Sequence, residues 1–331
     1  MSHNHTAEKN MMLLEVENLS VVYEGQKGPV VAVEDVSFSL EKGKTMGIVG
    51  ESGCGKTTIG MALLGLLPEN GYVRSGRIRF EGKELTALSR KEWQAFRWKK
   101  ISMIFQAAMN ALNPVQRVGD QVAEAIRIHS PGLSEEAIRE QVRELYELVD
   151  IPESRIRDYP HQYSGGMKQR AVIAMALSCH PDLVIADEPT TALDVIVQAQ
   201  VLDKIKDIQE RMGIAALFIS HDIGVVAEVC HDIMVMYAGR IVEYGKREEV
   251  FVSPVHPYTI ALLSSYLTID GVFDLHAETV PHECVYPSEP SPGACGYAGN
   301  CPNADEACFT RAPEWVEISP SHRALCRKAC W

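Results

Sequence analysis

The sequence has no long apolar run and no excess of basic residues. Its longest apolar stretch, residues 59–67, is shorter than the roughly 18 residues of a membrane-spanning helix. The formal net charge of −12 argues against a broad nucleic-acid-binding surface, because such surfaces are usually basic. The start of the chain, MSHNHTAEKN, lacks the basic and apolar segments of a signal peptide. We therefore expect a cytosolic protein, or one attached to a membrane through a partner.

The composition is that of a globular protein. Of 331 residues, 46% are apolar and 23% are charged, which is enough to build a core in one large or two unequal domains. Nine cysteines are present, and six of them lie between Cys284 and Cys330. In a cytosolic chain, cysteines are more often metal ligands or buried thiols than disulfides.

A glycine-rich stretch, GESGCGKTT at residues 50–58, follows an apolar strand-like run and precedes a helix-like run. This arrangement is typical of a phosphate-binding loop, G-x-x-x-x-G-K-[ST]. Glycines let backbone N–H groups converge on phosphate oxygens, a lysine adds a full positive charge, and a threonine hydroxyl can bind Mg²⁺. The alternative is a glycine-rich turn that matches by accident. The predicted phosphate-binding residues are Gly50, Ser52, Gly53, Gly55, Lys56, Thr57 and Thr58.

Strand-like and helix-like runs alternate along the chain, which predicts a mostly parallel sheet covered on both faces. Ligands of such sheets bind at the carboxyl ends of the strands, where the phosphate loop and several polar residues are placed. The predicted strands are 13–23, 33–40, 76–81, 101–105, 183–186 and 214–219. The predicted helices are 88–98, 122–129, 134–149, 163–179 and 195–212, with Ser134 as an N-cap.

Four polar side chains follow three of the predicted strands. Asp187 ends an apolar strand and is placed to hold Mg²⁺, and Glu188 can orient or deprotonate an attacking water. His221 can contact the terminal phosphate, and Gln106 can sense metal and water. The competing interpretations are a solvated acidic turn and a core histidine. Tyr23, at a strand end, is either an ordinary strand-end tyrosine or a ring that stacks on adenine.

With these residues in place, the chain resembles the ATP-binding subunits of ABC transporters over about residues 13–266. The resemblance rests on the phosphate loop, Phe105-Gln106, Ser164-Gly165-Gly166-Met167-Lys168-Gln169, Leu183 to Pro189, Ala192-Leu193-Asp194 and Ser220-His221-Asp222. It implies an α/β P-loop ATPase with an N-terminal antiparallel β subdomain and a helical subdomain at about 107–180. Residues 1–12 are expected to be disordered, and residues 267–331 to form a small, irregular, cysteine-rich tail domain.

The resemblance also implies a two-subunit machine. Glycine backbone and a hydroxyl at a helix start form a second phosphate cradle, which in this family acts on ATP held by the opposite subunit. We expect that role for Ser164, Gly165, Gly166 and Gln169, with Asp194 in the loop that crosses between subunits. ATP and Mg²⁺ are the implied ligands, and Tyr23 becomes the expected adenine platform.

Further motifs resemble the oligopeptide and dipeptide importer ATPases. They are Asn113-Pro114, residues 158–163 (DYPHQY) and His256-Pro257-Tyr258-Thr259. Cys54 and Tyr163 depart from the family pattern, which usually has Ser and Leu there, without removing a needed group. The resemblance implies a peripheral subunit on the cytoplasmic face of the membrane, coupling ATP hydrolysis to peptide uptake. The implied partners are a second ATPase subunit, two integral membrane permeases and an extracytoplasmic substrate-binding protein.

The tail is rich in proline and cysteine and too poor in apolar residues to fold around a large core of its own. It has no tight C-x-x-C pair of the zinc-ribbon type, so an iron–sulfur cluster, zinc and free or oxidised thiols all remain open. The resemblance favours a structural [4Fe–4S] cluster held by Cys295, Cys301, Cys308 and Cys326, with Cys284 and Cys330 outside the ligand set.

A rival function is a soluble ABC-type ATPase that acts on nucleic acid or ribosomes. Such chains typically contain two ATPase cassettes or a long coiled coil. This sequence has one phosphate loop and no sustained heptad run, so we expect no nucleic-acid partner. The sequence leaves open the cargo, which could be a dipeptide, oligopeptide, nickel or an oligosaccharide. It also leaves open whether the partner ATPase is a second copy or, as the subfamily favours, a paralogue.

Overall fold

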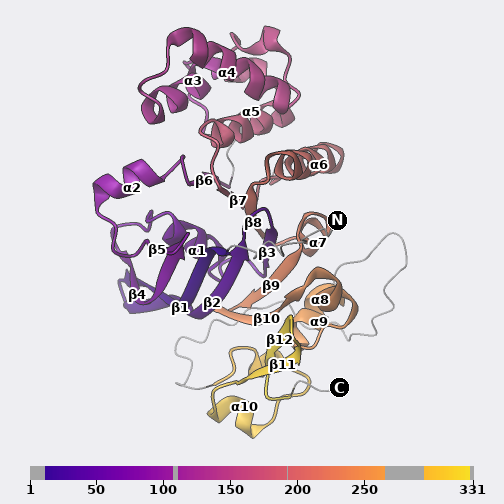
Figure 1. Cartoon of the computed structure of the whole chain (residues 1–331). Coiled ribbons are helices and arrows are strands. Elements are labelled where there is room, and N and C mark those ends of the chain that lie inside the picture. Colours follow the sequence, from indigo (N-terminus) through magenta and orange to yellow (C-terminus); the bar gives the residue numbers. More distant parts are fainter. Residues whose placement is uncertain (1–11, 107–110, 192, 265–293, 329–331) are drawn as a thin grey trace, which may run out of the picture.

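The computed structural model describes residues 12–106, 111–191, 193–264 and 294–328 (Figure 1). The predicted disordered segment at 1–12 therefore lies outside the described part except for Met12, as do Cys284 and Cys330. Within the described ranges, no helix is long and apolar enough to cross a membrane.

An antiparallel sheet opens the chain, as the sequence predicts. Its strand order is β2–β1–β4–β5, from β1 (Met12–Gly25), β2 (Gly28–Glu41), β4 (Gly71–Phe80) and β5 (Lys83–Glu84). Alternating side chains of β1, such as Leu14 and Val16, are buried, while Glu15 and Glu17 face outward. This alternation places one apolar face of the sheet against the rest of the molecule.

A second, eight-stranded sheet forms the centre of the molecule, in the order β11–β12–β10–β9–β3–β8–β7–β6. The strands β3 (Thr45–Val49), β6 (Ile101–Ile104), β7 (Leu183–Asp187), β8 (Ala215–Ser220) and β9 (Asp232–Tyr237) pair in parallel. Every residue of β3, β7 and β8 is buried, as expected for strands covered on both faces. The parallel arrangement brings the carboxyl ends of these strands to one edge.

Three helices pack together as a separate layer, drawn at the top of Figure 1. They are α3 (Val118–His129), α4 (Glu135–Leu148) and α5 (Gly165–Leu177). In α4, Ile138, Val142, Leu145 and Tyr146 recur at helical spacing and are buried. The predicted cap is confirmed, because the Ser134 side chain accepts a hydrogen bond from the Ala137 N–H.

The remaining helices flank the sheets or connect strands. Helix α6 has the predicted bounds, and α2 is shorter than predicted. These helices are α1 (Lys56–Leu63), α2 (Arg90–Phe96), α6 (Val195–Met212), α7 (Ile223–Val229), α8 (Arg247–Val252) and α9 (Pro257–Ser264).

The prediction of an irregular tail is wrong for its last described part. Strands β11 (Trp315–Ser319) and β12 (His322–Leu325) form a hairpin, and β12 pairs with β10 (Arg240–Lys246) of the central sheet. Short helical segments precede it at Ala298–Asn300 and Glu306–Thr310 (α10). The tail thus completes the central sheet and shares its hydrogen bonding.

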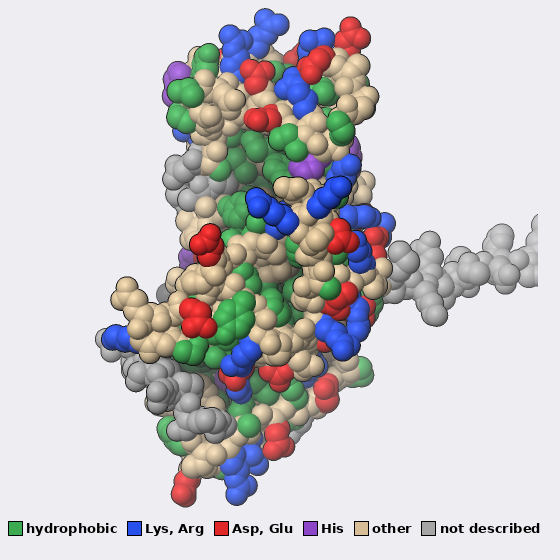
Figure 2. Space-filling model, turned by 90° about the vertical axis from the view of Figure 1, so that its left-hand side faces the viewer, with side chains coloured by type: hydrophobic (Ala, Val, Ile, Leu, Met, Phe, Trp, Pro, Cys, Tyr) green, Lys and Arg blue, Asp and Glu red, His purple; other side chains and the backbone are tan. Residues whose placement is uncertain are grey.

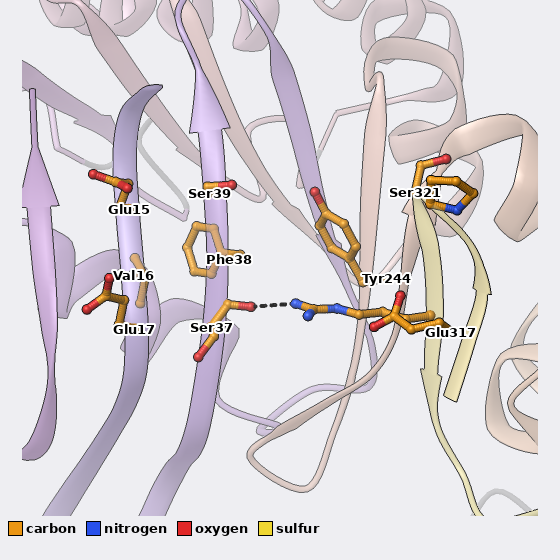
Figure 3. A pocket seen from close by; sticks show the side chains of 11 residues that line it. Glu15, Val16, Glu17, Ser37, Phe38, Ser39, Tyr244, Glu317 and Ser321 are labelled. Atoms are coloured by element: carbon orange, nitrogen blue, oxygen red, sulfur yellow. Dashed lines mark hydrogen bonds between the residues drawn. The ribbon is translucent and has the colours of Figure 1, made fainter. Parts of the chain in front are cut away.

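A cavity of about 380 Å³ marks the seam between the tail and the N-terminal sheet (Figure 3). Arg323 crosses this seam: its guanidinium donates to the Ser37 carbonyl at 3.2 Å and lies over the rings of Trp315 and Tyr244. Glu15 and Glu317 also line the cavity.

Candidate functional site

The phosphate loop runs from β3 into α1 and rests on neighbouring strands. A Cβ added to Gly50 would lie 2.1 Å from the Met236 carbonyl oxygen, and one added to Gly55 would lie 2.3 Å from that of Ala32. Gly55 also has a φ of 106°, a backbone conformation that residues other than glycine rarely adopt. Backbone at these positions is therefore pressed against β9 and β2, and only glycine fits.

Lys56 points back into the loop that precedes it. Its buried ammonium donates to the carbonyl oxygens of Gly50 and Glu51, both at 2.7 Å. These bonds hold a full positive charge at the N-terminus of α1, where the helix dipole adds to it. The arrangement suits a polyphosphate.

Thr57 and Asp187 lie together beside the loop. The Thr57 hydroxyl donates to Asp187 Oδ1 at 3.2 Å, although the two residues are 130 positions apart. Burial raises the pKa of Asp187, and the Thr57 hydrogen bond opposes that rise. A hydroxyl and a carboxylate at this separation are hard oxygen donors of the kind that Mg²⁺ takes together with phosphate oxygens and water.

Glu188 is the centre of a second cluster. Its Oε2 accepts hydrogen bonds from the Gln106 amide and the Thr191 hydroxyl, both at 2.9 Å, and its Oε1 lies 2.9 Å from His221 Nδ1. Partial burial opposes ionisation, but the His221 and Thr191 hydrogen bonds outweigh it and lower the pKa of Glu188. The carboxylate is therefore held ionised and oriented.

Glu188 also sits in a constrained backbone position. Its φ of 47° is in the left-handed region, which turns the chain sharply at the end of β7. That turn aims Asp187 and Glu188 at different partners, the first at Thr57 and the second at Gln106 and His221. Thr191 was not predicted; the only signal was a hydroxyl three residues after the carboxylate.

Tyr23 lies next to the start of α1. Its hydroxyl donates to Thr58 Oγ1 at 3.2 Å, and its ring would be 2.5 Å from a Cβ added to Gly71. The ring thus stands at the rim of the phosphate loop, in reach of a nucleotide bound there.

The signature residues belong to the helical layer. Ser164 caps α5 by accepting from the Met167 N–H at 3.3 Å, and Gly166 is close enough to α6 that an added Cβ would lie 2.7 Å from Val197. Asp194 caps α6 through the Val197 N–H at 3.0 Å. In Figure 1, α5 lies with α3 and α4, away from α1 and the phosphate loop. Gln169, on α5, is buried.

Tyr163, one of the two departures from the family pattern, has partners for its hydroxyl. It donates to the Arg155 carbonyl at 2.8 Å and lies 3.1 Å from the Tyr146 hydroxyl. Burial raises the pKa of both tyrosines. The buried polar group is thereby satisfied, and it ties the residue before α5 to α4.

The four tail cysteines chosen from the sequence line one cavity, together with His256 and Tyr297. Burial raises the pKa of the Cys295, Cys301 and Cys326 thiols. In the described ranges, no three His, Cys, Asp or Glu side chains converge tightly enough to hold a single metal ion. The cavity that the four thiols line is small, about 20 Å³.

The Tyr297 hydroxyl supplies a second observation at this cavity. It is buried and has no hydrogen-bond partner among the described residues. A buried orphan hydroxyl is costly, and a cluster sulfur is an acceptor that would satisfy it. Four thiols and a buried hydroxyl are groups that an iron–sulfur cluster would use, but the described residues form no metal-binding group.

Comparisons with known proteins agree with this geometry. Residues 33–191 match the family described as ABC transporter, and residues 242–308 match the oligopeptide/dipeptide transporter C-terminal region. The dipeptide transport ATP-binding protein DppD of Bacillus subtilis is 47% identical over 321 residues, covering 95% of this chain and 94% of that protein. The oligopeptide transport ATP-binding protein OppD of Salmonella typhimurium is 44% identical over 324 residues, covering 96% and 94%.

Solved structures share the fold. One described as a dimeric bacterial ABC transporter cassette has a TM-score of 0.64 and 25% identity, and covers 71% of this chain and 99% of that chain. CbiO1 from Clostridium perfringens, described as part of an ABC transporter complex, has a TM-score of 0.65 and 28% identity, covering 77% and 96%.

Proposed function

Because this chain belongs to the family of ATP-binding subunits of oligopeptide and dipeptide ABC transporters, we propose that it couples ATP hydrolysis to peptide uptake through partner permeases. The family is an ATPase family, so the reaction is ATP + H₂O to ADP + phosphate. The observation that carries the proposal is the pair of clusters at one sheet edge, Thr57 with Asp187 and Glu188 with Gln106 and His221.

We assign the following roles to the chain's own residues. The backbone of the phosphate loop and Lys56 bind the phosphates, and Tyr23 stacks on adenine. Thr57, Asp187 and Gln106 hold Mg²⁺, which when bound neutralises the charge on the phosphate oxygens. The loop contributions come from Gly50, Ser52, Gly53, Gly55, Lys56, Thr57 and Thr58.

Hydrolysis then needs an oriented water. Glu188, with its lowered pKa, is ionised near neutral pH and accepts a hydrogen bond from the attacking water. The water oxygen attacks the terminal phosphorus in line with the bond to ADP, its proton leaves toward Glu188, and the ADP oxygen leaves. His221 is assigned the contact with the terminal phosphate. Its Nδ1 lies 2.9 Å from Glu188 Oε1, which places the ring beside the carboxylate.

We propose that two ATPase subunits close on two ATP molecules. Ser164, Gly165 and Gly166 would contact ATP held by the partner, and Asp194 lies in the loop that crosses the interface. The Gln169 side chain is 3% exposed, so the contact expected for it from the sequence is not proposed. We infer a paralogous partner, hence a heterodimer, together with two permeases and a substrate-binding protein. Residues 106–118, of which 107–110 lie outside the described part, are the proposed docking region for a permease.

We further propose that the ATPase domain spans 13–266 and that the tail, 267–331, holds a [4Fe–4S] cluster through Cys295, Cys301, Cys308 and Cys326. The shared cavity and the orphan hydroxyl of Tyr297 support this ligand set. Thiolate ligation would tie together three tail segments, which gives the cluster a structural role. Absorbance and EPR spectra with iron and sulfide analysis test it; a colourless zinc protein would refute it.

Isolation of the native membrane complex through this subunit tests the function. We expect two permeases, a second ATPase and a peptide-binding protein to copurify. Copurification with ribosomes or nucleic acid instead would favour the soluble-ATPase alternative. Figure 2 shows Lys and Arg intermingled with Asp and Glu on one face, which is unlike the single-sign field of a nucleic-acid-binding surface.

A further inference from the structure

A residue far from the phosphate loop in sequence holds the first turn of that loop. The Glu51 N–H donates to the Tyr258 hydroxyl at 3.0 Å, across 207 positions. Tyr258 lies at the start of α9 and is 3% exposed, so its hydroxyl reaches the loop from inside the protein. The Glu51 N–H belongs to the same peptide group as the Gly50 carbonyl, and that carbonyl accepts a hydrogen bond from Lys56 at 2.7 Å. Tyr258 therefore fixes the peptide from which the Lys56 ammonium is oriented.

The Tyr258 ring is locked in a cluster of three tyrosines. Its centroid lies 4.6 Å from that of Tyr237 and 5.4 Å from that of Tyr297, and the latter two are 5.2 Å apart. Tyr237 ends β9, directly after Met236, whose carbonyl is in close contact with Gly50. The loop's first turn is thus held on two sides by the same cluster.

The third ring belongs to the tail. Tyr297 lies in the turn closed by the Ala298 N–H and the Cys295 carbonyl at 3.0 Å, and it lines the cysteine cavity. His256 lines the same cavity, and its Nδ1 accepts from the Tyr258 N–H at 3.1 Å. The rings of Tyr297 and Tyr258 therefore form a continuous chain of contacts from the wall of the cysteine cavity to the phosphate loop.

We propose that Tyr258 is a positioning residue of the nucleotide site, and that the cluster of Tyr237, Tyr258 and Tyr297 couples the state of the cysteine cavity to nucleotide affinity. The proposal rests on the proposed ATPase site. Coupling between two sites is reciprocal in free energy, so a cavity that changes nucleotide affinity must in turn be changed by nucleotide binding. This reciprocity gives a readout that does not depend on activity.

Titration of the full-length chain with a fluorescent ATP analogue and Mg²⁺ tests the loop end. Tyr258→Phe deletes the hydroxyl and keeps the ring, and it should raise Kd roughly three- to tenfold, the equivalent of one hydrogen bond. In the assembled transporter, KM for ATP should rise while kcat stays within about twofold, because Tyr258 touches no reacting atom. Tyr244→Phe, at the tail seam, is the matched control and should leave Kd unchanged.

Thiol labelling tests the coupling. In the chelator-treated full chain, a non-hydrolysable ATP analogue should slow alkylation of the four cavity cysteines about threefold or more, as followed by mass spectrometry of each peptide. The slowing should persist in Tyr244→Phe and disappear in Tyr258→Phe and Tyr297→Leu. Peptide resolution matters because Cys54 lies in the loop itself and is shielded directly.

The outcomes distinguish a failure of the proposed ATPase site from a failure of the role proposed for Tyr258. If the wild-type chain binds no nucleotide, the proposed ATPase site is wrong. If wild type and Tyr258→Phe bind with equal affinity, only the positioning role is overturned. If nucleotide slows labelling equally in wild type and Tyr258→Phe, or in neither, the coupling is overturned.

Discussion

The nucleotide site and the junction of β10 with β12 of the tail each contain a paired glutamate and histidine, but the two pairs differ in burial. At the strand ends, the His221 side chain is 59% exposed and its partner Glu188 is 12% exposed. Where β12 of the tail pairs with β10, His322 and Glu243 are 2% and 0% exposed and lie 2.7 Å apart. Glu243 accepts two further bonds, from the Val255 and His256 N–H groups.

The difference in burial distinguishes a carboxylate that can change hydrogen-bond partners during the reaction from a carboxylate that stabilises the fold. Glu188 bonds to side chains that can turn toward a water or a phosphate. Glu243 has its acceptors filled by two backbone groups and a buried histidine, so any change leaves a donor unpaired without access to solvent. The first region should respond to mutation in rate, and the second in stability.

The largest expected effect is on rate. Glu188→Gln removes the carboxylate charge but keeps the shape, so hydrolysis should fall on the order of a hundred- to ten-thousandfold, the usual contribution of a general base. ATP affinity should change by less than about threefold, and a closed dimer should accumulate. Phosphate release and size-exclusion chromatography with ATP measure both. Near-wild-type hydrolysis would contradict the role given to Glu188.

Glu243→Gln should have the largest effect on stability. The amide NH₂ would face N–H donors and leave His322 without its carboxylate, which should cost about 3 kcal/mol of unfolding free energy. Denaturant unfolding measures the loss. Glu317→Gln, exposed at the tail seam, is the control and should stay within about 0.5 kcal/mol. Equal stability of both variants would show that the buried pair does not hold the tail.

His256, which lines the cysteine cavity, predicts a pH dependence. Burial lowers the pKa of His256 from 6.5 to about 4. The unfolded state therefore binds the extra proton first, and stability is lost as pH falls from 6.5 toward 4. From about pH 7.5 to about pH 5, this histidine should account for about 2 kcal/mol of unfolding free energy.

His256→Asn is the variant that isolates this term, because its amide oxygen can still accept from the Tyr258 N–H. Unfolding curves at several pH values should show a flatter acid limb than in wild type. A His161→Asn control, at an exposed position, should keep the wild-type slope. If His256→Asn also keeps it, the histidine is not buried in its neutral form.

The smallest effect is expected at Arg323. Arg323→Lys keeps the charge but loses the planar stack on Trp315 and the fixed bond to the Ser37 carbonyl. A loss of about 1 kcal/mol, or a Tm lower by roughly 2–4 °C, is expected from one half-exposed cation–π contact and one hydrogen bond. Thermal unfolding measures it. An unchanged Tm would show that the seam is held by backbone pairing alone.

Local signals in the sequence predict the residues that the structure brings together at the strand ends. The phosphate loop, the strand before Asp187 and helix α6 each have their pattern within a short window, and parallel strands bring their ends together. The fully buried strands β3 and β7 are recognisable because they are continuously apolar.

Long-range pairing explains what the sequence did not predict. The sequence patterns do not predict strands β9 and β10, helices α7 and α8 or the tail hairpin. Strand β12 is short and forms by pairing with β10, where Glu243 lies opposite Ala324, 81 positions later. Likewise, nothing near Glu51 in the sequence indicates its bond to Tyr258. Such contacts depend on where distant segments meet.

The central claim is that this chain drives peptide transport by hydrolysing ATP. The most direct measurement is ATP hydrolysis by the isolated complex in lipid vesicles, with and without its binding protein and a di- or oligopeptide. We predict hydrolysis that rises severalfold with both added, accompanies peptide uptake into the ATP-containing compartment, and is lost in Glu188→Gln. Hydrolysis that ignores peptide and moves none across the membrane would contradict the account.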